Sequence, residues 1–254
     1  MGGAITTAMI LIIPIAVSVH TVVSWIFAMT LREPWNSTIF GAFFVAGAIF
    51  SGVGTLIVVM AVLRKVYHLE EYITEKHFVY LGYLMAAFTL IMMYGNISEY
   101  LVTGYKMEEG AEFHFRQLFL EQFAGFYWFY FIGGLVVPGL LILLPWTRNI
   151  WGIVAAAVLV DAAMWVERYF IVVTGFRVPL MPYDPATYAP SWVELSVVAA
   201  GFALFALLIT LFVKVFPIIA VWEVAEDLES AELAPAAGRL PSGAAPEPAG
   251  GGSR

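Results

Sequence analysis

The sequence predicts an all-α membrane protein with six transmembrane helices and a disordered C-terminal tail. Of its 254 residues, 61% are hydrophobic and 12% are charged, and the mean hydropathy is +0.87. A soluble domain carries about 25% charged residues. The chain also contains six apolar segments, each longer than the roughly 20 residues that cross a hydrocarbon core of about 30 Å. The last residues, by contrast, are rich in Ala, Pro and Gly.

Short polar breaks separate the six segments, and none leaves room for a soluble domain. We expect residues 1–223 to form one transmembrane helical domain and residues 224–254 to form the disordered tail, whose composition cannot bury a core. The N-terminus has no basic region typical of a signal peptide. The expected spans are residues 4–30, 38–63, 78–103, 121–144, 150–173 and 192–221.

Six spans put both termini on one side of the membrane, which we call side B, and the opposite side is side A. Basic residues in the short loops divide equally between the sides, so the positive-inside rule does not choose an orientation. The adjacent Arg64 and Lys65, just after the second segment, favour side B as cytoplasmic. Small residues in that segment, such as Gly47 and Ser51 four apart, predict close helix packing.

The composition excludes several kinds of redox centre in this chain. There is no cysteine, and therefore no disulfide, iron–sulfur cluster or thiolate metal site. Only His20 of the four histidines lies deep in an apolar segment, whereas a transmembrane bis-histidine haem needs two. We expect no cofactor or metal in the chain, a partner subunit or a quinone as the redox centre, the lipid bilayer as surroundings, and no nucleic acid.

The fifth segment, residues 150–173, carries the most informative polar residues: Asp161, Glu167 and Arg168. An ionisable residue costs several kcal/mol in the middle of a bilayer, by insertion-based estimates of about 2.5–3.5 kcal/mol. Asp161 and Arg168 are seven residues apart, so they share one helix face about 10 Å apart along the axis, and Glu167 points elsewhere. This face is either a buried ion pair that locks two helices together or part of a proton path.

Other polar side chains lie at related depths in the membrane. The direction of each span places them between side A and the middle of the membrane, where they would form a hydrated cluster of polar side chains. Such a cluster fits either a proton half-channel or a closed network of salt bridges, and both interpretations stay open. The candidate proton-path residues are His20, Glu99, Asp161, Glu167, Arg168 and Glu194.

Two further stretches near side A allow specific interpretations. The aromatic run at residues 123–131 is either a belt at the lipid headgroups or the wall of a quinone site. The loop at residues 174–191 contains four prolines and three aromatic residues, which is too stiff and apolar for a free linker. We interpret this loop as a docking surface for a partner protein.

Several motifs resemble the NrfD/polysulfide-reductase-type family of membrane subunits. Within this family, the chain is most similar to the quinol-oxidising membrane subunit of alternative complex III. The resemblance covers nearly all of residues 1–223 and matches the C-terminal six-helix part, which includes a four-helix bundle. The motifs are SVHTVVSWIFAM at 18–29, REPW at 32–35, FFVAGAIFSG at 43–52, WVERY at 165–169 and YDP at 183–185.

The resemblance implies a subunit of a respiratory quinol:electron-acceptor oxidoreductase complex in the bacterial inner (cytoplasmic) membrane. Such subunits hold no cofactor and bind quinol, here menaquinone or another quinone, beside an iron–sulfur subunit that takes the electrons. Haem-c subunits and other membrane subunits are the further expected partners, and proton translocation is expected through polar residues. By the resemblance, side A is periplasmic, and four N-terminal helices of the family have no counterpart in this chain.

Three alternatives remain. In the same family, the chain would anchor a molybdenum-enzyme reductase of the polysulfide or DMSO reductase type. In other classes, it is a purely structural anchor with every charge paired, or a small transporter. A transporter would be favoured by an inverted repeat with broken helices, and no convincing repeat is present.

Overall fold

The computed structural model describes residues 2–30, 32, 34–107, 111–179 and 188–216. Within these residues the secondary structure is entirely helical. Six helical stretches are long and apolar enough to cross a membrane, as the sequence predicts. The predicted tail and most of the predicted docking loop lie outside the described residues.

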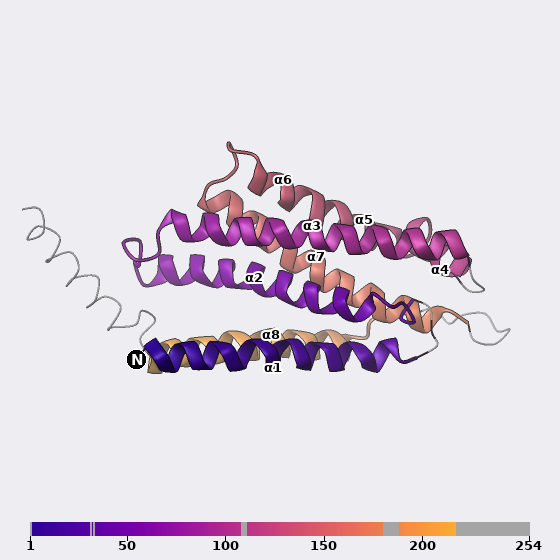
Figure 1. The fold of residues 1–254 in the computed structure, drawn as a ribbon, viewed down its shortest axis with the longest axis horizontal. Helices are drawn as coiled ribbons and strands as arrows, with labels where there is room; N and C mark the ends of the chain where they lie inside the picture. The colour runs from indigo at the N-terminus through magenta and orange to yellow at the C-terminus, as the bar shows by residue number, and fades with distance from the viewer. Residues whose placement is uncertain (1, 31, 33, 108–110, 180–187, 217–254) are drawn as a thin grey trace, which may run out of the picture. The chain divides into compact units, whose positions relative to one another are not determined.

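The helices follow one another along the chain with short connections (Figure 1). The fourth span consists of three consecutive segments, α5, η1 and α6, and a short helix, α4, precedes it. The bounds are α1 Gly2–Ala28, α2 Phe40–Val66, α3 Glu75–Lys106, α4 Ala111–Phe119, α5 Ala124–Trp128, η1 Phe129–Val136, α6 Val137–Leu143, α7 Ile150–Arg177 and α8 Trp192–Val215.

Four spans pack into a bundle: α2, α3, the α5–η1–α6 span and α7. Its core is apolar and includes Phe50, Met85, Tyr130 and Ile153, none of which is exposed. Among the described helices of residues 1–187, α1 packs against α2 alone, and most of its surface is exposed. The expected four-helix bundle is therefore present, and α1 lies outside it.

The fourth span contains a π-helical stretch that the sequence analysis did not anticipate. At its end the amide of Val137 donates to the carbonyl of Ile132, five residues earlier, and Pro138 follows without an N–H of its own. Gly134, which belongs to this stretch, lies so close to α7 that an added Cβ atom would collide with the side chain of Ala163. π-Helical turns cost regular hydrogen bonding and are frequent at functional sites.

The ends of the helices differ from the expected spans by a few residues. The fifth span continues to Arg177, so residues 174–177, predicted as loop, are helical. Glu121, predicted to open the fourth span, lies in a turn before α5 and pairs with Arg116 on α4 at 3.1 Å. Amphipathic turns at the membrane surface extend or interrupt a helix without changing its hydropathy, so composition does not locate these ends.

The connection between α1 and α2 covers the end of α7. Trp35 is 2% exposed, donates its indole N–H to the carbonyl of Ile171 at 3.0 Å, and lies against Gly175. Arg32 donates to the carbonyl of Gly175 at 3.0 Å. Both residues belong to the REPW motif, which therefore satisfies carbonyl groups of the last turns of α7.

Residues 188–254 form a second unit, in which α8 is the described helix. Ser191 caps it by accepting from the amide of Glu194, and Glu194 accepts from the amide and the hydroxyl of Ser191 at 2.6 Å and 2.8 Å. This reciprocal arrangement is a capping box.

Candidate functional site: buried charges between α2 and α7

Asp161 lies about halfway along α7 and faces α2. Its Oδ2 accepts a hydrogen bond from the hydroxyl of Thr55 at 3.3 Å. Its Oδ1 is buried and has no hydrogen-bond partner. A carboxylate with one long hydrogen bond and one unpaired oxygen is costly inside a membrane bundle, so this side chain is not closed off by the protein.

Glu167 and Arg168 form an ion pair two turns along α7 from Asp161. Arg168 Nη1 lies 3.5 Å from Glu167 Oε2, and the side chain of Glu167 is 1% exposed. Neither carboxylate oxygen of Glu167 has a hydrogen-bond partner. Arg168 also reaches α2, where its Nη2 donates to the carbonyl of Phe44 at 3.2 Å and its guanidinium lies 3.9 Å from the centre of the Phe44 ring.

Two glycines of α2 provide the space for these side chains. A Cβ atom on Gly54 would lie 2.6 Å from Asp161 Oδ1, and one on Gly47 would lie 2.7 Å from Arg168 Nη2. Gly47 and Gly54 are seven residues apart on α2, and Asp161 and Arg168 are seven residues apart on α7. Because the two helices are antiparallel, Gly54 lies opposite Asp161 and Gly47 lies opposite Arg168. Gly47 and Gly54 therefore lie at the predicted close contact and accommodate the charges of α7, whereas a Cβ on Gly52 would meet nothing within 4 Å.

A second polar group lies in the interior between α3 and the fourth span. The hydroxyl of Tyr127 donates to Asn96 Oδ1 at 2.9 Å, and both side chains are buried. The hydroxyl of Tyr130 is buried close to Asn96 and lies within electrostatic range of Glu167 and Arg168. Tyr130 lies in η1, so the π-helical stretch places a hydroxyl beside the buried ion pair.

The aromatic run of the fourth span is divided between the interior and the surface. Tyr127 contacts the rings of Tyr100, Phe119, Phe131 and Phe170, which come from α3, α4, η1 and α7. Trp128 is largely exposed, as a belt residue would be. The belt at the lipid headgroups stays a prediction for the exposed part of the run, and Tyr127 joins α3, α4, η1 and α7.

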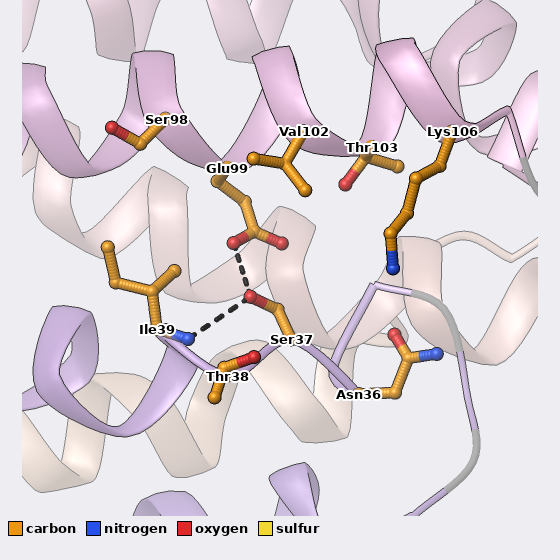
Figure 2. Close-up of a pocket in the computed structure, with 9 residues that line it drawn as sticks. All are labelled: Asn36, Ser37, Thr38, Ile39, Ser98, Glu99, Val102, Thr103 and Lys106. Carbon is orange, nitrogen blue, oxygen red and sulfur yellow. Dashed lines mark hydrogen bonds between the residues drawn. The ribbon is translucent and has the colours of Figure 1, made fainter.

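Glu99 lies nearer the end of α3, in a polar pocket beside the α1–α2 connection (Figure 2). The hydroxyl of Ser37 donates to Glu99 Oε2 at 2.5 Å, and the same oxygen of Ser37 accepts from the amide of Ile39 at 3.3 Å. The pocket has a volume of about 240 Å³, and Lys106 lines it together with Glu99.

The other two candidate residues make local contacts. His20 on α1 uses Nδ1 to contact the carbonyl of Ala16 on its own helix at 2.7 Å. Glu194 caps α8 in the second unit. The structure thus places Asp161 and Arg168 against α2, pairs Glu167 with Arg168, and places Glu99 near the end of α3. The proton path over all six residues stays a prediction.

His114 on α4 is a buried titratable residue that the sequence analysis missed. Both ring nitrogens are buried without hydrogen-bond partners, and burial lowers the pKa of His114 from 6.5 to about 4. The expected spans place residues 104–120 in a loop. The buried residues Ala111, His114 and Leu118 follow helical spacing, and that pattern in the sequence could have indicated a short helix with one buried face.

This fold and site define a class of protein: a multi-pass membrane protein whose helical bundle holds ionisable side chains and, among the described residues, no cluster of three or more potential metal ligands. The family model for polysulphide reductase, NrfD, matches residues 4–179. The chain therefore belongs to the NrfD family. Members are membrane subunits of quinol-linked oxidoreductase complexes and assemble with iron–sulfur and other subunits. A search of curated proteins finds no match.

Proposed function

We propose that this chain is the membrane subunit of a quinol-oxidising respiratory complex of the alternative complex III type and that its bundle handles protons. The resemblance of the five motifs supports the type of complex. The buried carboxylates support proton handling, and Glu167 is the observation that carries it, because both its oxygens are buried without a hydrogen bond.

The geometry favours a proton path over a purely structural anchor. An anchor needs each buried charge closed off by a partner, whereas a path needs polar groups that water or protons can reach. Asp161 Oδ1 has no hydrogen-bond partner, and Glu167 has an ion pair with Arg168 but no hydrogen bond to either oxygen, so neither carboxylate is fully closed off by the protein. Protons would pass from Asp161 along α7 to Glu167, beside the permanently charged guanidinium of Arg168.

From the ion pair, the proposed path continues through residues that the tertiary structure supplies. Tyr130 lies within electrostatic range of Glu167, and the hydrogen-bonded pair of Tyr127 and Asn96 follows. Glu99 is one turn beyond Asn96 on α3 and opens into the polar pocket at the end of the bundle. Arg168 lies 3.5 Å from Glu167 on this path and would keep its side chain in position.

Quinol is a substrate of the complex, and the proposed proton path uses side chains of this chain without a quinol bound to it. The polar pocket at Glu99 has no aromatic residue among the nine described residues that line it. A quinol ring needs flat apolar walls as well as polar groups at its two oxygens. We expect menaquinone or another quinone to donate electrons to a neighbouring iron–sulfur subunit, and haem-c subunits to accept them.

Asp161→Asn tests proton handling. The complex would be purified with its partner subunits and reconstituted into vesicles, and the protons released per electron would be measured with quinol as donor. The variant should assemble normally and show slower turnover with a lower proton yield. Glu112→Gln, an exposed carboxylate on α4, serves as the control and should behave as the parent. Normal turnover with a normal proton yield in Asp161→Asn would refute the path.

The type of complex needs a separate experiment. Purification from the native membrane, followed by identification of the partner proteins and the extracted quinone, separates the proposal from its same-family alternative. Iron–sulfur and haem-c subunits support the alternative complex III type. A molybdenum-enzyme subunit without haem c would instead identify the anchor of a polysulfide or DMSO reductase type of enzyme, with electrons possible in either direction.

A further inference from the structure

The pocket at Glu99 combines several polar groups at one end of the bundle. Figure 2 shows side chains of α3 facing the connection between α1 and α2 across it. Five of the lining residues carry a hydroxyl or an amide, among them Asn36, Ser37 and Thr103. The connection supplies Asn36, Ser37 and Thr38, and α3 supplies the opposite wall.

Among the described residues that line this pocket, one side chain carries each charge. Glu99 and Lys106 are seven residues apart, so both project from one face of α3, about 10 Å apart along the axis. In Figure 2 the carboxylate of Glu99 points to Ser37, and the ammonium of Lys106 points toward the part of the connection that contains Asn36. Such a wall is complementary to a ligand that carries both an anionic and a cationic group.

An apolar groove of about 900 Å³ adjoins the pocket between α1, α2 and α3. Asn36, Ser37 and Thr38 line both spaces, so the polar pocket continues directly into the groove. On α1 the groove extends from Ala28 to Val17, which is roughly 16 Å at 1.5 Å per residue. That length corresponds to about one leaflet of a hydrocarbon core of about 30 Å.

We propose that this pocket and groove bind one phospholipid that has a primary amine in its headgroup, as phosphatidylethanolamine does. The ammonium of the lipid donates to Glu99 and to the hydroxyl oxygen of Ser37. Its phosphate accepts from Lys106, with Asn36 and Thr38 at the rim. One acyl chain lies in the groove along α1, between Trp25 and Ile49. The lipid thereby joins α1 to the bundle, beyond its direct packing on α2.

The lining favours this occupant over the other amphiphiles of a bacterial membrane. A lipid with an uncharged glycerol headgroup carries no cation for Glu99, and a choline headgroup has no N–H to donate. A quinol headgroup is uncharged and flat, and the polar pocket has no aromatic residue among its described lining residues. The opposite charges of Glu99 and Lys106, at separate points of the pocket wall, therefore favour a zwitterionic headgroup with N–H donors.

Native mass spectrometry of the purified, delipidated full chain tests this proposal. The chain would be titrated with phosphatidylethanolamine, phosphatidylcholine and phosphatidylglycerol of the same acyl composition. We expect retention in that order, with phosphatidylethanolamine strongest. Glu99→Gln and Lys106→Gln should each weaken binding of phosphatidylethanolamine by roughly tenfold, because each removes one charge-assisted hydrogen bond. Glu75→Gln and Lys76→Gln, at the other end of α3, are the matched controls and should bind as the parent does.

A third variant tests the groove without changing any charge. Ala42 lines the groove and is exposed, so Ala42→Phe should fill it and reduce lipid retention. Val62→Phe is an exposed position of the same helix outside the groove and should leave retention unchanged.

Three outcomes would overturn the proposal. Equal retention of the three lipids would show that the pocket does not read the headgroup. Equal losses in the control variants at Glu75 and Lys76 would place the effect elsewhere. Displacement of phosphatidylethanolamine by a short-chain quinone at similar concentration would assign the pocket to quinone instead. None of these readouts depends on turnover, so they are independent of the proposed proton path.

Discussion

Asp161 on α7 lies so close to Gly54 on α2 that a Cβ atom on Gly54 would come within 2.6 Å of Asp161 Oδ1. The carboxylate thus occupies a space that exists only because residue 54 has no side chain. The same holds two turns away for Arg168 over Gly47. The packing of α2 against α7 and the positions of the buried charges therefore depend on each other.

Gly54→Ala should destabilise the bundle by about 1–3 kcal/mol, because the added methyl overpacks the contact with Asp161. Thermal unfolding of the purified chain in nanodiscs would show a lower Tm. Gly52→Ala is the matched control on the same helix, because a Cβ at that position meets nothing within 4 Å. Equal Tm values for the two variants would contradict the close approach of α2 and α7.

Arg168→Ala should cost about 3–5 kcal/mol of stability, because it leaves the buried carboxylate of Glu167 unpaired. The double variant Glu167→Gln/Arg168→Ala should recover part of the loss, since a neutral amide is less costly to bury than a charge. Arg116→Ala removes an ion pair whose arginine is 66% exposed, so it should cost at most about 1 kcal/mol. Denaturant unfolding of the three variants measures these differences. A loss no larger in Arg168→Ala than in Arg116→Ala would argue against the buried pair.

His114 should make the folded chain less stable in acid. Its pKa is about 4 in the folded protein and near 6.5 when unfolded, so unfolding takes up a proton between these values. Stability should fall as the pH drops from about 7 to about 4, by up to about 3 kcal/mol, and should not change further below that through this residue.

His114→Leu removes the two buried nitrogens and should flatten this part of the pH profile. His68→Asn is the control, because His68 is exposed and has a φ of 54°, which asparagine tolerates well. Unfolding midpoints between pH 4 and pH 7.5 provide the comparison. A profile of His114→Leu as steep as that of the parent would show that His114 is not the cause.

Trp35→Ala should loosen the α1–α2 connection from the end of α7 and cost about 3–5 kcal/mol. Trp35→Phe retains a ring but loses the hydrogen bond to Ile171, so its cost should be smaller. Trp146→Ala is the control, because that tryptophan is 87% exposed. Hydrogen exchange of the last two turns of α7 should increase in Trp35→Ala alone. Unchanged exchange there would contradict the capping role of the connection.

The sequence predicted the six apolar spans because hydropathy and length respond to the membrane directly, without reference to packing partners. It also predicted that Asp161, Glu167 and Arg168 share one helix and that α2 packs closely through small residues. It did not predict the π-helical stretch. The hydrogen bonding there depends on Pro138 and on the close packing of Gly134 against Ala163 of α7, and the second of these is a contact between helices. It missed His114 for the same kind of reason, since the burial of a short surface helix depends on its neighbours.

By itself, therefore, the sequence determined the class of fold, the number of candidate spans and the presence of costly charges in one of them. Each follows from local composition and helical periodicity. Only the tertiary structure decided that Arg168 pairs with Glu167 while Asp161 meets Thr55, that Tyr130 lies near the ion pair, and that Glu99 faces Ser37 across a pocket. Glu167 and Arg168 are neighbours on α7, but the other relationships join different elements of the fold. Antiparallel register and close packing set those contacts, and the sequence of one helix cannot specify them alone.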